Sequence, residues 1–307
     1  MTPKGGARSA TRSEHTLGLL LGLGAYGCWG LFPIYIKSVA VPPVEMLAHR
    51  VVWAFLLLLG LSAYQGRWGE LRGALRGRRT AALLAASTVM ITINWMVYIW
   101  AVASGRILEG SLGYFINPLV NVILGVLVLK ERPARPVVAA VLVAAAGVGW
   151  LTFQVGHPPW ISLTLALSFG LYGLLRKVVS VGAVIGLTVE TALLAPPALG
   201  YLLWLKAAGS LSFLSGSAGR DALLVLAGPI TALPLLLFAG AARRLRLSTL
   251  GLVQYLSPTL QLLVGVWLYG EPFTPARAVA FTFIWAGLAI FAVYSLRRGR
   301  PEPVTEG

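Results

Sequence analysis

The sequence predicts an all-α polytopic membrane protein of ten transmembrane helices arranged as two related halves. Of its 307 residues, 57% are hydrophobic and only 11% are charged, and the mean hydropathy is +0.80. Apolar runs of about 20 residues, the length that crosses the hydrocarbon core of a bilayer, recur along the whole chain. The chain also matches itself when it is shifted so that Arg106 falls on Arg246. Together these features place the chain in the membrane class and indicate an internal repeat.

Ten apolar segments are expected to span the membrane, and the short stretches between them carry the Gly, Pro and Arg residues that are typical of turns. The segment before the first span is basic, as in a signal peptide, but the apolar run that follows is too long for a signal core. We therefore expect residues 1–16 and 297–307 to form terminal tails. The predicted spans are 17–37, 43–64, 80–102, 108–129, 135–153, 159–179, 184–205, 221–241, 247–269 and 276–296.

The basic residues occur on alternate connections between the spans. If the N-terminus faces the cytoplasm, the cytoplasmic segments hold 19 of the 25 Lys and Arg residues. This asymmetry obeys the positive-inside rule, so we expect both termini to be cytoplasmic. These residues are Lys4, Arg8, Arg12, Arg67, Arg72, Arg76, Arg78, Arg79, Lys130, Arg132, Arg135, Arg176, Lys177, Arg243, Arg244, Arg246, Arg297, Arg298 and Arg300.

Other classes of function lack the residues that they need. The net charge of +15 is divided among short loops and leaves no basic face that could bind nucleic acid. Cys28 is the only cysteine and Asp221 the only aspartate, and the chain has no His-Glu-x-x-His, Gly-x-Ser-x-Gly or nucleotide-binding loop. We therefore expect no catalytic residues, no metal, no cofactor and no enzymatic activity. Nothing indicates an obligatory protein partner.

The repeat predicts an inverted architecture. The matched positions place the spans 108–129 and 135–153 over 247–269 and 276–296, which are five spans later. Because five is odd, the two copies must cross the membrane in opposite directions, as in many secondary transporters. We place the first repeat at 17–153 and the second at 159–296. The matching pairs are Arg106/Arg246, Leu112/Leu252, Pro118/Pro258, Gly125/Gly265, Val126/Val266, Glu131/Glu271, Ala140/Ala280, Ala146/Ala286 and Gly147/Gly287.

Polar side chains in both halves are candidates for a substrate path. In the first half, Asn94 and Tyr98 share one face of their span, and Tyr114, Asn117 and Asn121 share one face of the next. The candidates in the second half are the repeat equivalents of the last three. All these side chains could line a central space, or they could hydrogen-bond between helices and stabilise packing. The candidates are Asn94, Tyr98, Tyr114, Asn117 and Asn121 in the first half, and Gln254, Ser257 and Gln261 in the second.

Three ionisable residues within predicted spans are candidates for coupling. Glu45 and His49 lie one turn apart, with Arg50 adjacent, and Glu190 lies in the corresponding span of the other half. Intramembrane charges are costly and are often functional, so proton coupling or recognition of a substrate charge is one interpretation. A purely structural ion pair near a helix end is the other. Glu131 and Glu271, at helix ends, are interpreted as structural.

Several segments resemble the RarD group of EamA-type transporters, in the drug/metabolite transporter superfamily. The resemblance extends from about Leu17 to Tyr294. The segments that carry it are Glu45–Arg50, Asn94–Val102, Ser111–Leu119, Gly228–Pro234 and Ser248–Tyr255.

This resemblance implies a bacterial inner-membrane permease of two five-helix EamA repeats. It implies an exporter of a small organic metabolite or drug, and members of the group are often labelled chloramphenicol-sensitivity proteins. The residues alone leave a channel or facilitator-type pore as the alternative, because a channel could have the same number of helices. The expected partners are a small-molecule substrate, the lipid bilayer and, if the intramembrane charges titrate, protons.

Overall fold

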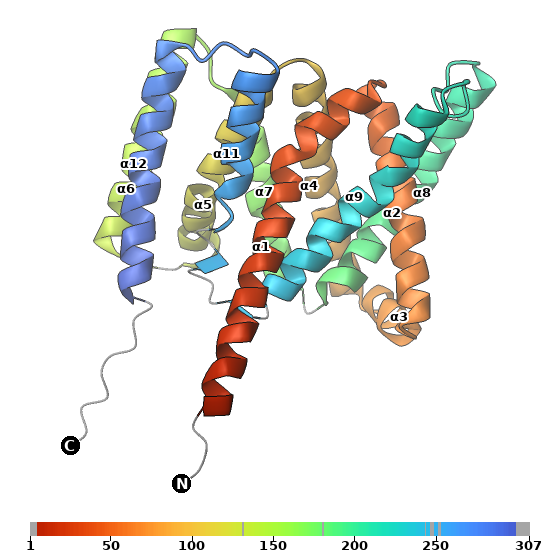
Figure 1. Cartoon of the computed structure of the whole chain (residues 1–307), viewed down its shortest axis with the longest axis horizontal. Helices are drawn as coiled ribbons and strands as arrows, with labels where there is room; N and C mark the ends of the chain where they lie inside the picture. Colours follow the sequence, from red (N-terminus) through yellow and green to blue (C-terminus); the bar gives the residue numbers. More distant parts are fainter. Residues whose placement is uncertain are drawn as a thin grey trace.

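The computed structural model describes residues 5–130, 132–179, 181–242, 244–245, 249–250 and 253–298. Every regular element in these ranges is a helix, and nine of the helices are long and apolar enough to cross a membrane. This confirms the all-α polytopic fold class (Figure 1). The helices that match predicted spans are α1 (Gly5–Val39), α2 (Pro43–Tyr64), α4 (Arg78–Ala103), α5 (Ile107–Leu129), α6 (Arg135–Val155), α7 (Trp160–Val178), α8 (Ala183–Ala207), α9 (Ala218–Ala242) and α12 (Pro275–Arg298).

The structure describes only part of the predicted span 247–269. The described part of it contains α11 (Leu256–Leu263), which continues as the π-helical turn η1 (Val264–Leu268). Residues 249 and 250 are also helical, and the run Leu256–Leu268 is apolar. Pro258 lies in the first turn of α11, where a proline costs no intrahelical hydrogen bond. Positions 246–248 and 251–252 lie outside the described residues, as does Glu131.

Two further elements differ from the predicted boundaries. The first helix begins at Gly5, within the stretch that was expected to be a tail. An additional helix, α3 (Trp68–Arg76), occupies the basic connection between α2 and α4. Arg67 precedes it and donates hydrogen bonds of 2.8 and 2.7 Å to the Glu70 carboxylate, which hold the pKa of Glu70 below its usual value. Its polar residues form no apolar run, so none of the predicted spans covers this segment.

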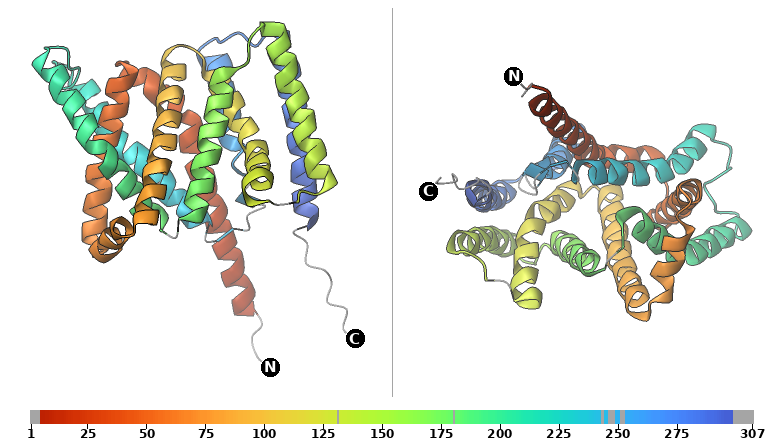
Figure 2. Two further views of the ribbon diagram at one scale, coloured as in Figure 1. Left: turned by 180° about the vertical axis from the view of Figure 1, so that it is seen from behind. Right: turned by 90° about the horizontal axis from the view of Figure 1, so that it is seen from below.

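All the long helices run between two ends of the molecule. One end carries α3, the start of α1 and the end of α12, as Figures 1 and 2 show. We call it the basic end, because Arg67, Arg72 and Arg76 lie there, and we call the other the opposite end. Since α1 starts and α12 finishes at the same end, the chain crosses between the ends an even number of times.

The helix packing repeats when the two halves are exchanged. Helix α1 packs on α9 as α4 packs on α7, and α5 packs on α7 as α11 packs on α1. Likewise, α2 packs on α9 as α4 packs on α8. The pairs α2–α8, α5–α11 and α6–α12 map onto themselves under the exchange. Equivalent helices run in opposite directions, as α1 and α7 do in Figure 2, so the two halves are inverted.

The pair α6–α12 shows this symmetry at the level of atoms. A Cβ placed on Gly147 would lie 2.9 Å from the carbonyl oxygen of Ala280. A Cβ placed on Gly287 would lie 2.6 Å from the carbonyl oxygen of Ala140. The two glycines are one matched pair of the internal repeat, and the two alanines are another. The two helices therefore approach backbone to backbone around a local two-fold axis, as small residues permit in membranes.

We expect Gly287→Ala to lower the thermal stability of the protein, because the new methyl group would overlap a backbone carbonyl of α6. The matched control is Gly149→Ala on α6, where a Cβ would meet nothing within 4 Å. Alanine at that exposed helical position should be neutral or stabilise by about 0.5–1 kcal/mol. Thermal unfolding of the purified variants measures both effects. Equal melting temperatures for the two variants would contradict the close approach.

A buried apolar cluster lies at the opposite end. It joins residues of α1, α2, α4, α5, α7 and α9. At the basic end the buried clusters are separate: one joins α3, α4 and α8, and the other joins α1 and α9. The cluster at the opposite end contains Phe32, Ile36, Val39, Met46, Tyr98, Ile99, Ala101, Val102, Ile107, Ile161, Leu165 and Leu224.

Candidate substrate-binding site

Asn94 is the centre of a buried hydrogen-bond network that adjoins this cluster. Its amide nitrogen donates to the carbonyl oxygen of Leu165 at 3.1 Å and to the hydroxyl of Ser168 at 3.2 Å. Its amide oxygen accepts a hydrogen bond of 3.1 Å from the Tyr114 hydroxyl. The network therefore connects α4, α5 and α7, and it includes helices of both halves.

Aromatic rings surround this network. The Tyr98 ring lies 5.5 Å from the Tyr114 ring and stacks parallel to Phe32 at 6.1 Å. The Tyr98 hydroxyl is buried and makes no hydrogen bond within the described part of the chain. A buried hydroxyl without a partner is costly, so each one in a folded protein calls for an explanation. Tyr98 lies beside Tyr114 and one helical turn from Asn94, which are two other candidates for the substrate path.

Arg50 lies beside Phe32, one of these rings, and is not among the site residues predicted from the sequence. Its guanidinium carbon is 4.7 Å from the centre of the Phe32 ring and 4.2 Å from that of Trp95. Its Nε donates a hydrogen bond of 2.9 Å to the hydroxyl of Thr231 on α9. The side chain is 6% exposed, and no described carboxylate forms an ion pair with it. The sequence feature that could have indicated Arg50 is a cationic residue within the predicted apolar span 43–64.

The other candidate path residues lie at two symmetric interfaces. On α5, Asn117 donates to the Ala166 carbonyl of α7 at 3.1 Å, and Asn121 donates to the side chain of Asn117 at 3.2 Å. On α11, Gln261 donates to the Trp29 carbonyl of α1 at 3.2 Å and to Ser257 at 3.3 Å. These bonds are the interhelical contacts that the packing interpretation expects, and contact with a substrate stays a prediction.

Gln254 is half-buried just before α11. It takes no part in the hydrogen bonds that join Asn94 to its described neighbours. The structure therefore brings Asn94, Tyr98 and Tyr114 together, and it places Ser257 and Gln261 of the second half at the α1–α11 contact.

Glu45 and His49 lie near the opposite end. The Glu45 carboxylate accepts hydrogen bonds from the backbone nitrogen and the hydroxyl of Ser212, at 2.7 and 2.9 Å, and so holds the α8–α9 connection against α2. The His49 Nε2 lies 3.9 Å from the same carboxylate, and the imidazole ring packs on Phe213 at 5.2 Å. Glu45 thus has a clear structural role.

Glu190 is buried nearer the basic end. Its carboxylate accepts hydrogen bonds from the Ser87 hydroxyl at 2.6 Å and from the Tyr172 hydroxyl at 3.2 Å, and Arg176 lies 3.8 Å away. The rings of Tyr172, Phe169 and Tyr114 follow one another at centroid distances of 6.0 Å. A continuous run of aromatic side chains therefore links Glu190 to the Asn94 network.

Comparison with known proteins decides the family. Residues 16–153 match the EamA-like transporter family. An uncharacterized transporter of Vibrio cholerae is 44% identical over 283 residues, which are 92% of this chain and 94% of the relative. The chain belongs to the EamA-like transporter family. Protein RarD of Escherichia coli is 43% identical over 285 residues, 92% of this chain and 96% of that protein, so the chain is of the RarD type.

The fold of this EamA-like transporter is also found in a solved crystal structure. The two superpose with a TM-score of 0.58 at 19% sequence identity. The match covers 93% of this chain and 99% of the other. At this identity, the likeness shows the fold alone.

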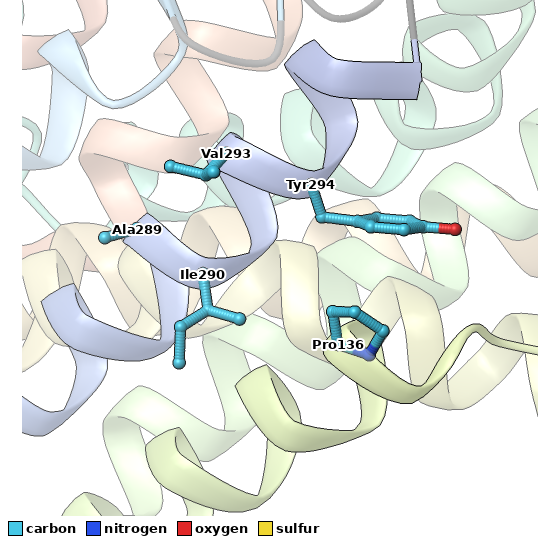
Figure 3. Close-up of a pocket in the computed structure, with 5 residues that line it drawn as sticks. All are labelled: Pro136, Ala289, Ile290, Val293 and Tyr294. Atoms are coloured by element: carbon cyan, nitrogen blue, oxygen red, sulfur yellow. The ribbon is translucent and has the colours of Figure 1, made fainter.

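A depression on the outside of this EamA-like transporter is unrelated to the network. It lies between the start of α6 and the end of α12 and is lined by Pro136, Ala289, Ile290, Val293 and Tyr294 (Figure 3). The α6–α12 pair lies at one edge of the helix bundle (Figure 2). Its lining is almost entirely apolar, as expected for a surface that faces lipid. We therefore take the polar network as the candidate substrate site.

Proposed function

We propose that the protein is a secondary active transporter that exports a small organic metabolite or drug across the bacterial inner membrane by alternating access. The observation that carries this proposal is the exchange symmetry of the helix contacts, with a buried polar network between the two halves. Two inverted halves can adopt two nearly equivalent arrangements that open to opposite sides. A channel does not need this symmetry.

We propose that the basic end, with both termini, faces the cytoplasm. The positive-inside rule supports this orientation. The apolar cluster then closes the periplasmic side. On α5, Asn117 is buried, and Asn121, about one turn further from the cluster, is exposed. The arrangement corresponds to a state that is closed to the periplasm and accessible from the cytoplasm, as an exporter needs in order to load its substrate.

Reconstitution into proteoliposomes tests the proposal. Chloramphenicol and a set of small metabolites would be screened for flux, with empty liposomes as the control. A transporter gives flux that saturates with substrate concentration, and it exchanges labelled for unlabelled substrate without a net gradient. Flux that rises linearly with concentration and shows no such exchange would favour the channel instead.

We propose that protons drive export and that Glu190 is the coupling carboxylate. It is buried within the membrane, and the run of aromatic rings connects it to the substrate network. Intramembrane carboxylates commonly mark proton relays. Glu45 and His49 are weaker candidates, because the contacts of Glu45 with Ser212 already explain its burial.

Glu190→Gln should abolish flux driven by a pH gradient and leave substrate exchange at equal concentrations, because the amide cannot take up a proton. The measurement is flux into inverted vesicles before and after the gradient is collapsed. Glu109→Gln is the control, since that carboxylate is partly exposed near the opposite end and lies 3.9 Å from Arg277. Gradient-driven flux that survives Glu190→Gln would remove Glu190 from the coupling role.

A further inference from the structure

Arg50 is a buried cation without a counter-ion in the described part of the protein. Among the described residues, its guanidinium donates one hydrogen bond, from Nε to Thr231, and faces two aromatic rings. A guanidinium group has five N–H donors, so the donors of its two terminal nitrogens are left for another acceptor.

The environment compensates only part of the cost of this charge. A charged side chain within the hydrocarbon region is expensive, and it is normally paired or in contact with water. Contacts with Phe32 and Trp95 supply cation–π stabilisation, which recovers a fraction of that cost. An uncharged side chain such as leucine would fit an apolar span better. The contacts of Arg50 with the described residues therefore leave part of the cost of its charge uncompensated.

The internal repeat shows what is missing. Arg50 and Glu190 are related by the same shift that places Arg106 on Arg246, and so they occupy equivalent positions on α2 and α8. In the second half, Glu190 has Arg176 at 3.8 Å together with two hydroxyl donors. In the first half, Arg50 has no corresponding acid among the described residues. One of two equivalent buried charges thus has a counter-ion within the protein, and the other has none among the described residues.

The groups around Arg50 fit an organic ligand with an acidic group. The aromatic faces of Phe32 and Trp95 lie against it, and Tyr98 stacks on Phe32. The Tyr98 hydroxyl supplies a further buried donor that has no partner among the described residues. The two terminal nitrogens of a guanidinium match the two oxygens of a carboxylate in a bidentate pair.

We propose that Arg50 binds the carboxylate of an organic anion with an aromatic or apolar body, and that this anion is the class of substrate transported. The proposal rests on the transport function above. The anion neutralises Arg50 when it binds, and its body packs against the aromatic rings. Because Arg50 is hydrogen-bonded to α9 of the other half, the bound anion lies where both halves meet.

Binding to the purified protein in nanodiscs tests this proposal without requiring transport. The probes are phenylacetate, benzoate and 4-phenylbutyrate, each compared with its neutral amide by calorimetry. We expect an acid to bind and its amide to bind more than about tenfold more weakly, because the amide leaves the buried charge unpaired. An amide that binds as tightly as its acid, or three acids that fail to bind at millimolar concentration, would overturn the proposal.

Variants connect the binding to the residue. Arg50→Gln should reduce the affinity for the acid more than about tenfold, and Arg50→Lys should restore part of it. Arg106→Gln is the matched control, because Arg106 also stacks on a tryptophan, Trp100 at 5.4 Å, but is exposed at the opposite end. Unchanged affinity in Arg50→Gln would overturn the assignment of Arg50. If acids bind through Arg50 but never cross the liposome membrane, the transport proposal fails and the anion site stands.

A structural role for Arg50 makes a different prediction. If its charge only held the helices together, Arg50→Met would unfold at a clearly lower temperature. If the charge serves a ligand, removing it relieves an uncompensated cost, and the melting temperature without ligand should stay the same or rise. A marked fall in the melting temperature of Arg50→Met, with the affinity of Arg50→Lys for the acids no better than that of Arg50→Gln, would overturn the ligand role.

Discussion

Replacing Glu271 with alanine is expected to destabilise the protein by about 3 kcal/mol. The Glu271 carboxylate accepts hydrogen bonds from the backbone nitrogens of Ile107 and Leu108, at 2.6 and 2.9 Å. These are the first residues of α5, where the N–H groups have no acceptor within the helix. Alanine would leave both donors buried and unpaired, and it would remove a negative charge from the positive end of the helix dipole. Thermal or denaturant unfolding in detergent measures the loss.

Two variants control for simpler explanations of this effect. Glu271→Gln keeps one acceptor oxygen, so it should lose less stability than alanine does. Glu109→Gln changes a carboxylate at the same end of the molecule, where its ion pair with Arg277 is 3.9 Å long and partly exposed. Pairs of this kind contribute between 0 and about 1 kcal/mol. Losses of the same size for Glu271→Ala and Glu109→Gln would exclude helix capping as the source of the stability that Glu271 provides.

The role of Glu271 was only partly predictable from the sequence. Its position at a helix end indicated a structural residue, but the helix that it caps begins far earlier in the chain, at Ile107. No local sequence pattern predicts a contact between residues so far apart in the chain. The apolar spans were predictable because the thickness of the bilayer sets their length. The helix α3 was not, since it is short, polar and outside the hydrocarbon region.

The internal repeat was the most informative pattern in the sequence. It predicted the inverted relation of the halves, and Gly147 and Gly287 show it in the contact between α6 and α12. It did not predict that matched polar residues lie at two separate interfaces, because a sequence offset relates positions and does not say which neighbour each side chain meets. The importance of Arg50 was hidden for the same reason. Its burial depends on rings from α1 and α4 that surround it only in the folded protein.

Tyr98→Phe separates substrate contact from helix packing more cleanly than any amide substitution in the network. The Tyr98 hydroxyl has no hydrogen-bond partner in the described structure, so its removal should leave the melting temperature unchanged or slightly higher. If the hydroxyl binds substrate, transport should nevertheless fall by about tenfold or more, because a transported polar group would lose its donor. Flux in proteoliposomes and thermal unfolding of the same preparation provide the two readouts.

Tyr114→Phe is the matched control, because the hydroxyl of Tyr114 already donates to Asn94 at 3.1 Å. Its removal leaves the Asn94 oxygen unpaired and should lower both the melting temperature and the flux. The two tyrosine rings lie 5.5 Å apart, so a general disturbance of the aromatic cluster would affect both variants alike. A fall in flux without a fall in stability is therefore expected for Tyr98 alone. If Tyr98→Phe transports normally, its hydroxyl lies outside the substrate path, and the path must follow Asn94 and Arg50 instead.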